Sequence, residues 1–111
     1  MPMIKLHTAK KVTGDLLVEL SSVVAEATGK PVRYVMAVAE RADTTMGGEE
    51  CDAVYAEVKG IGGMDGAMNR KISAGVCELI ETRLGIPPDR VYIVFEPIPA
   101  DRWGWNGSTF G

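Results

Sequence analysis

The sequence has 111 residues, of which 46% are hydrophobic and 24% charged, and its formal net charge at pH 7 is −3. This length and composition predict one globular domain with a single hydrophobic core, and they exclude a disordered chain. Because Lys and Arg are scattered through a net negative chain, nucleic acid is not expected as a partner. A membrane is not expected either, since no apolar run approaches the roughly 20 residues that cross a bilayer.

The first half of the chain predicts a strand, a helix and a second strand. Residues 2–8 and 34–40 have the composition of strands. Between them, residues 15–28 place apolar side chains at helical spacing. Gly29 ends this helix, and Pro31 prevents its continuation.

The second half repeats this order at a constant offset. Residues 53–59 predict a strand, residues 67–84 a helix, and residues 91–96 a second strand. The equivalent positions pair Gly29 with Gly85, Pro31 with Pro87, and Glu40 with Glu96. The chain is therefore predicted to contain one βαβ unit twice, at about residues 2–52 and 53–99.

Two βαβ units predict an α+β domain in which a four-stranded sheet carries two helices on one face, because right-handed crossovers return to the same side. The strands hold more apolar side chains than one helix layer needs, namely Met3, Ile4, Val35, Val54 and Ile93. We therefore expect an apolar open face that drives oligomerisation. Residues 100–111 are expected to form a C-terminal hairpin, packed either on a neighbouring subunit or on its own domain.

Neither a metal nor a cofactor is expected from these residues. His7 is the single histidine, and Cys51 and Cys77 form no CxxC pair, so we expect reduced thiols and no metal site. The glycine-rich segment 60–66 lacks both the dinucleotide and the P-loop patterns. Its glycines instead leave backbone N–H groups around Ile61 available to an anionic ligand.

The beginning of the chain lacks the pattern of a signal peptide, because Lys5, His7, Lys10 and Lys11 interrupt any apolar segment. We therefore expect a cytoplasmic protein, with secretion conceivable only by a route that needs no leader.

Pro2 is a candidate base, because initiator methionine is commonly removed before a small residue. An α-amino group titrates near pH ~7.7–8.0. In an apolar pocket beside a cation its pKa falls, so the amine is largely unprotonated at neutral pH. If Met1 is retained, the Pro2 nitrogen is an amide without a basic lone pair.

Several motifs, in order along nearly the whole chain, resemble the macrophage migration inhibitory factor family of the tautomerase superfamily, which includes D-dopachrome tautomerase-like members. These motifs are MPMI at the start, ATGKP (27–31), IGG (61–63), AMNRKIS (67–73) with Cys77, PDRVYI (88–93) and WNGSTF (105–110). PDRVYI and WNGSTF are the most specific of them.

The resemblance implies a homotrimer whose three sheets form a central β-barrel, with sites between subunits. It further implies keto–enol tautomerisation of a small α-keto acid or enol such as phenylpyruvate, without a cofactor, and extends to dopachrome tautomerase activity. By position, Pro2 matches the catalytic base, Lys30 the lysine that holds the substrate carboxylate, and Ile61 the residue whose backbone N–H contacts substrate. Tyr92 matches a tyrosine that comes from the adjacent subunit. The pocket rim corresponds to Trp103 and Phe110.

Three departures from the family pattern limit this comparison. Val94 replaces a pocket asparagine of mammalian members, which puts recognition of a ring hydroxyl in doubt. Ala53 and Ala56 replace the family's CxxC, so thiol-disulfide activity is not expected. The connection at residues 9–14 is shorter than usual, with little expected effect on the site.

Two alternatives to the tautomerase remain open at the level of the sequence. The first is a cytokine-like binding protein with vestigial activity, whose partner is a protein receptor if the chain is secreted. The second is another reaction of the superfamily that uses the same proline, such as hydration, dehalogenation or decarboxylation. That chemistry needs an arginine in the pocket, a role open to Arg33 or Arg41.

Overall fold

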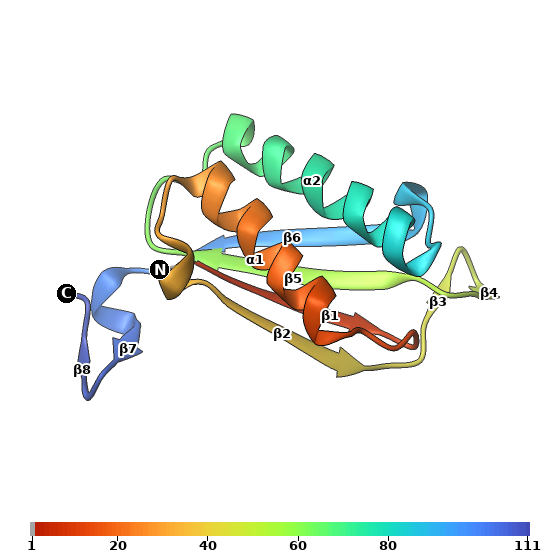
Figure 1. Ribbon diagram of the computed structural model, residues 1–111, viewed down its shortest axis with the longest axis horizontal. Coiled ribbons are helices and arrows are strands. Elements are labelled where there is room, and N and C mark those ends of the chain that lie inside the picture. Colours follow the sequence, from red (N-terminus) through yellow and green to blue (C-terminus); the bar gives the residue numbers. More distant parts are fainter. Residues whose placement is uncertain (1) are drawn as a thin grey trace.

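Strand β1 (Met3–Thr8) lies inside a four-stranded sheet of order β2-β1-β5-β6 in the computed structural model, which describes residues 2–111 (Figure 1). Helix α1 (Gly14–Thr28) connects β1 to its parallel neighbour β2 (Met36–Arg41). Helix α2 (Gly66–Leu84) connects β5 (Val54–Gly60) to its parallel neighbour β6 (Val91–Pro97). Antiparallel pairing of β1 with β5 joins the two halves into one mixed sheet. The predicted helices and the four predicted long strands are confirmed to within one or two residues.

Local capping explains where both helices begin and end. The Thr13 hydroxyl accepts a hydrogen bond from the Leu16 amide at 3.3 Å, and the Asp65 carboxylate accepts one from the Met68 amide at 2.8 Å. Gly29 and Gly85 follow the two helices with φ angles of 70° and 69°. Glycine adopts this left-handed conformation without steric cost, so it ends each helix at the position expected from the sequence.

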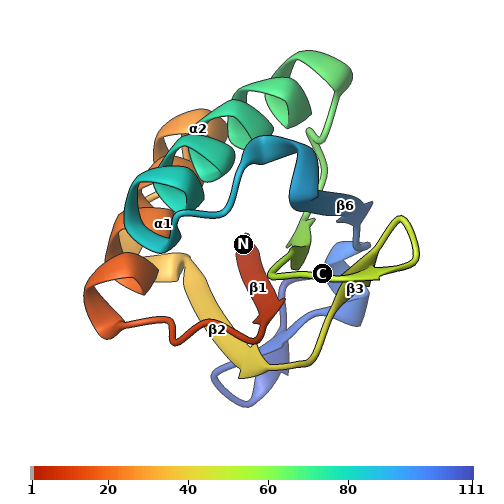
Figure 2. The same cartoon turned by 90° about the vertical axis from the view of Figure 1, so that its right-hand side faces the viewer.

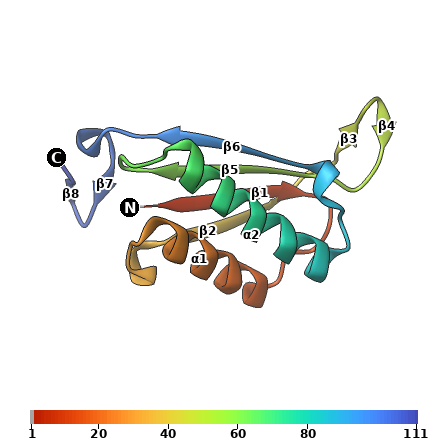
Figure 3. The ribbon, with the colours of Figure 1, turned by 90° about the horizontal axis from the view of Figure 1, so that it is seen from above.

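The hydrophobic core lies between the sheet and the two helices. Both helices cover the same face of the sheet, as the end view and the view from above show (Figures 2 and 3). A Cβ added at Gly75 of α2 would lie 2.7 Å from Cγ1 of Val23 on α1, so the glycine permits the close approach of the helices. Alternate residues of the central strands and one stripe of each helix fill the core: Ile4, Leu6, Leu16, Leu20, Val24, Val54, Ala56, Val58, Ile72, Val76, Ile80 and Ile86.

The expectation of an apolar open face holds only in part. Ile4 and Val54 belong to the core, while Val35 and Ile93 pack against it from its edge. Successive strand residues point to opposite faces of a sheet, so the neighbours of the core residues lie on the open face. Some residues of the open face are charged, whereas Met36 and Val94 are apolar and are 62% and 51% exposed. The open face is therefore mixed.

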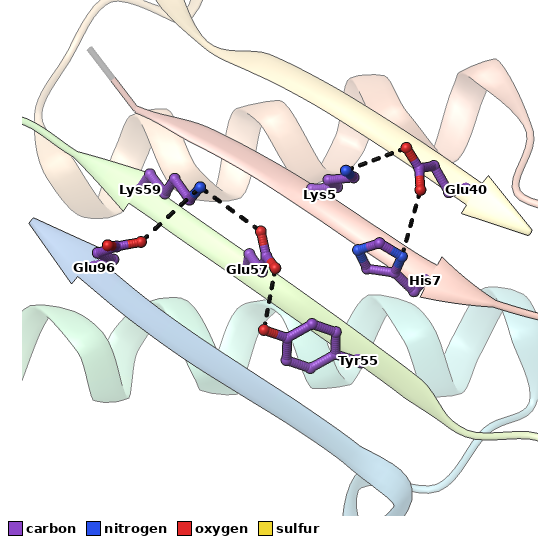
Figure 4. A network of polar contacts seen from close by, with 7 residues as sticks. All are labelled: Lys5, His7, Glu40, Tyr55, Glu57, Lys59 and Glu96. Carbon is purple, nitrogen blue, oxygen red and sulfur yellow. Dashed lines mark hydrogen bonds and ion pairs between the residues drawn. The ribbon is translucent and has the colours of Figure 1, made fainter. Parts of the chain in front are cut away.

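The open face also carries a polar network (Figure 4). Lys5 Nζ lies 3.1 Å from Glu40 Oε1, and His7 Nδ1 lies 3.6 Å from Glu40 Oε2. The Tyr55 hydroxyl donates a hydrogen bond of 3.1 Å to Glu57, which raises the pKa of Tyr55 above its usual 10.0. A surface of this kind can remain in contact with water or line a hydrated interface.

The two cysteines are free in the described chain, in keeping with the expected reduced thiols. Cys77 is half-buried on α2. Its partial burial raises the pKa of the thiol, as does the Glu81 charge, while a hydrogen bond with Ser73 acts in the opposite direction. A raised pKa lowers the thiolate fraction and hence the reactivity of Cys77 at neutral pH.

Two short hairpins and three helical turns complete the fold. The hairpin of β3 (Thr45–Met46) and β4 (Glu49–Glu50) lies at the end of the sheet where β1 finishes (Figure 1). The hairpin of β7 (Gly104–Trp105) and β8 (Ser108–Thr109) lies at the opposite end, beside the start of β1. The turns are η1 (Val32–Tyr34), η2 (Pro88–Arg90) and η3 (Ala100–Arg102).

Substitutions on opposite faces of α1 test this core. We expect Leu20→Ala, at a residue with 0% exposure, to lower the free energy of unfolding by about 2–5 kcal/mol through lost burial and a cavity. Val18→Ala, at a residue with 67% exposure on the same helix, should change it by no more than about 0.5 kcal/mol. Urea unfolding at one fixed protein concentration measures both, and equal losses would contradict the assigned helix face.

Candidate functional site

Pro2 lies at the end of the sheet where β1 begins and β5 finishes. It is buried, and its carbonyl oxygen accepts a hydrogen bond of 3.4 Å from the Met36 amide at the start of β2. Two hollows meet at this residue, because Pro2 lines both. Removal of Met1, on which the predicted amine depends, concerns the one residue outside the described range.

The first hollow, here called the lysine hollow, has a volume of about 180 Å³. It lies between the C-terminal end of α1, the end of β5 and the loop that leads into α2. Its lining consists of Pro2, Thr28, Lys30, Val58, Lys59, Gly60, Ile61, Gly62, Gly63, Met64 and Met68. The structure thus places three of the residues predicted for the site, Pro2, Lys30 and Ile61, around one hollow.

The loop after β5 presents its backbone to the lysine hollow. Gly62 and Gly63 have φ angles of 67° and 65°, a conformation that side-chain-bearing residues rarely adopt. The Asp65 amide donates a hydrogen bond of 3.0 Å to the Gly63 carbonyl, which closes the loop before α2. Two residues without side chains next to Ile61 leave room for a ligand to approach the peptide groups closely.

Lys30 provides a free positive charge at this hollow. It follows the left-handed Gly29, and its backbone amide donates a 3.4 Å hydrogen bond to the Thr28 hydroxyl. Within residues 2–111 no carboxylate lies within ion-pair distance of its ammonium group. Lys59 also lines the hollow, but its ammonium lies 3.9 Å from Glu57 and 3.9 Å from Glu96. An anion in the lysine hollow would therefore meet Lys30 as an unneutralised cation.

The second hollow, here called the aromatic hollow, has a volume of about 470 Å³. It lies between the start of the sheet, turn η1 and the C-terminal hairpin. Its lining consists of Pro2, Met3, Arg33, Tyr34, Val35, Met36, Ala37, Trp103, Gly104, Trp105 and Phe110. The predicted rim residues Trp103 and Phe110 thus lie around the same hollow as Pro2.

The C-terminal hairpin holds its aromatic side chains by short-range contacts. Asn106 and Gly107 have φ angles of 52° and 79°, as a two-residue turn between strands requires. The Trp105 ring stacks on Phe110 with centroids 5.7 Å apart, and it meets Tyr34 edge-on at 5.7 Å. The Phe110 amide donates a hydrogen bond of 3.2 Å to the Trp103 carbonyl. In the described chain the hairpin therefore packs on its own domain through Tyr34.

Sequence reasoning missed Tyr34 and Trp105 as lining residues. Trp105 belongs to the WNGSTF motif that predicts Phe110, and Tyr34 lies in the strand predicted at residues 34–40. In the structure Tyr34 belongs to turn η1, and β2 begins at Met36. The signal in the sequence was the short separation between Lys30 and an aromatic residue. Their common hollow arises from a contact between segments about 70 residues apart, which periodicity does not report.

Tyr92 lies far from Pro2 within one chain. It pairs with Tyr55, which pairs in turn with His7, whereas Pro2 precedes Met3 at the other end of β1. The Tyr92 side chain is 67% exposed on the open face, and Val94 on the same strand is 51% exposed. One chain alone therefore does not bring Tyr92 to Pro2, and its expected place in a neighbour's site stays a prediction.

The described part of the chain offers neither a metal site nor a helix that could span a membrane. Among residues 2–111, no three His, Cys, Asp or Glu side chains are grouped so that they could hold a metal ion. Within the same range neither helix has the length and hydropathy needed to cross a membrane.

Comparison with known proteins agrees with the fold of this chain. Residues 1–111 match the family model described as macrophage migration inhibitory factor (MIF). The macrophage migration inhibitory factor of Meriones unguiculatus is 39% identical over 114 residues, covering 99% of both chains. The homolog from Trichinella spiralis is 36% identical, covering 99% of this chain and all of the relative. The crystal structure of a homologue from Prochlorococcus marinus is 46% identical with a TM-score of 0.91, covering 98% of this chain and 99% of that one.

Proposed function

The chain belongs to the macrophage migration inhibitory factor family, and on that premise we propose that it is a cofactor-independent keto–enol tautomerase. Its base is the Pro2 amine, which becomes free when Met1 is removed. The observation that carries the proposal is the position of Pro2, buried where a hollow with an unpaired lysine meets an aromatic hollow. The substrate class is a small α-keto acid with an aryl or apolar group, and phenylpyruvate is the model compound.

The two hollows divide the substrate between them. Lys30 and the backbone at Ile61 hold the carboxylate, while Trp103 and Phe110 surround the aryl group and exclude water. Pro2 takes a proton from the carbon beside the ketone and returns it to the oxygen, or the reverse. Burial and a nearby cation both favour the neutral amine, which is the form that accepts a proton. Fixed donors near the carbonyl stabilise the enolate as it develops.

Replacement of the base tests the central claim. We expect Pro2→Gly to lower kcat/KM for phenylpyruvate by at least about 100-fold, since a positioned general base contributes 10²–10⁴-fold. Ultraviolet absorbance follows the keto–enol exchange. Intact mass must show that Met1 is absent from both proteins, and circular dichroism must show equal folding. A folded Pro2→Gly chain with normal turnover would refute Pro2 as the base.

Replacement of the free cation tests carboxylate binding. We expect Lys30→Gln to raise KM for phenylpyruvate about tenfold or more, because a hydrogen bond to a charged group contributes about 1.5–3 kcal/mol. Lys71→Gln on the exposed surface of α2 is the matched control and should leave KM within about twofold. If both variants had the same KM as the parent, the carboxylate would not lie at Lys30.

The proposed active form is a homotrimer whose sheets form a central barrel, in which Tyr92 of one copy reaches Pro2 of the next. The exposure of Tyr92 and its distance along the sheet from Pro2 support this arrangement. The ion-paired part of the open face would then line a hydrated channel.

Mixed assemblies test the shared site. Sedimentation should give a mass about three times that of the 11.9 kDa chain. If Pro2→Gly and Tyr92→Phe are each impaired, refolding them together should restore activity, because some sites then receive Pro2 and Tyr92 from different chains. Restored activity requires a shared site. A monomeric active protein, or no gain on mixing two impaired variants, would contradict it.

The alternative proposal is a cytokine-like binding protein in which the same pocket has little physiological turnover. The curated relatives support it by their name alone, macrophage migration inhibitory factor. Its partner would be a protein receptor, reached if the protein is secreted. A Met1-free trimer that fails to turn over phenylpyruvate would favour this alternative over the enzyme.

A further inference from the structure

Arg33 adds a second free cation to the site. It belongs to turn η1 and lines the aromatic hollow together with Pro2. Among the described residues that line this hollow, Arg33 is the charged one. No carboxylate within residues 2–111 lies at ion-pair distance from its guanidinium group.

The neighbouring ring restrains Arg33 without consuming its hydrogen-bond donors. Its guanidinium carbon lies over the Tyr34 ring, 4.7 Å from the ring centroid. Because no carboxylate among the described residues pairs with Arg33, its N–H groups remain available to a ligand. A planar fork of N–H groups matches a carboxylate, which can accept two parallel hydrogen bonds. Tyr34 also contacts Trp105 edge-on, so Arg33 lies next to the aromatic side chains of the hollow.

The charges around Pro2 differ in sign from the chain as a whole. The chain has a net charge of −3, yet the charged residues that line the two hollows are Lys30, Lys59 and Arg33. Glu57 and Glu96 partly neutralise Lys59, which leaves one unpaired cation in each hollow. A ligand that occupies both hollows would therefore meet a free positive charge in each of them.

We infer that Arg33 is a specificity-determining residue that selects substrates with a second acidic group, namely aryl α-keto acids whose ring carries a carboxylate. This inference rests on the proposed function, which places the α-keto carboxylate at Lys30 and the ring in the aromatic hollow. The reaction remains the same proton transfer between carbon and oxygen. Arg41 does not take this role, because it lies in a separate hollow with Lys10, Lys11 and Glu40.

A pair of substrates that differ by one carboxylate tests the inference. The measured quantity is the ratio of kcat/KM for 4-carboxyphenylpyruvate to that for phenylpyruvate. We expect the parent to favour the carboxylated substrate and Arg33→Gln to lower the ratio about tenfold, mainly through KM, because one charge-assisted pair is lost. Arg33→Lys should give an intermediate ratio, since it keeps the charge and loses the fork. Arg41→Gln is the control and should keep the parent ratio.

A purely structural role for Arg33, such as support of Tyr34, would affect both substrates equally and leave the ratio unchanged. That result would overturn the inference, as would a parent protein that does not favour the carboxylated compound. Calorimetry with 4-carboxycinnamate and cinnamate, which do not tautomerise, separates this inference from the proposed function. Tighter binding of 4-carboxycinnamate that Arg33→Gln abolishes would support Arg33 even without turnover. Equal binding of the two compounds by the parent would refute it.

Discussion

The antiparallel pairing of β1 with β5 is the constraint on which the rest of the molecule depends. It joins the two βαβ units with Met3 opposite Lys59, and this register places Pro2 beside the end of β5 and its glycine-rich loop. It also turns the inward side chains of both strands toward one helix layer. A shift by one residue would exchange the faces, exposing the core residues of one strand. The core and the site are therefore consequences of the same register.

The distribution of charge separates the site from the remaining surface. On the open face, lysines and glutamates lie next to one another, so their charges largely cancel. Around Pro2, Lys30 and Arg33 have no such partners among the described residues. Exposed ion pairs contribute little to stability, whereas an unneutralised cation beside a buried group acts on both ligands and pKa values. The site thus differs from the remaining surface because its cations have no carboxylate partners, and not because its residue types are unusual.

The mixed open face shows a limit of sequence reasoning. Ile4 and Val54 are apolar strand residues, and composition alone does not say which of two faces they occupy. The strand period of two places Ile4 on the face opposite to Lys5 and Met3, but it does not say which face the helices cover. The strand pairing shows which residues share a face, and the packing of the two helices on Ile4 and Val54 shows which face is buried.

The helices, the long strands, the duplicated order and the residues that resemble a proline-based site could all be predicted from the sequence. These features depend on local signals, such as the helix period of core residues and the glycines after each helix, and on motifs in a fixed order. The folded chain was needed to establish which residues share a hollow with Pro2, and that Tyr92 does not do so within one chain. It also showed Arg33 over Tyr34 and Trp105 beside that tyrosine. Such contacts join segments that are distant along the chain. Periodicity and motifs in a sequence do not report how far apart such segments lie in space.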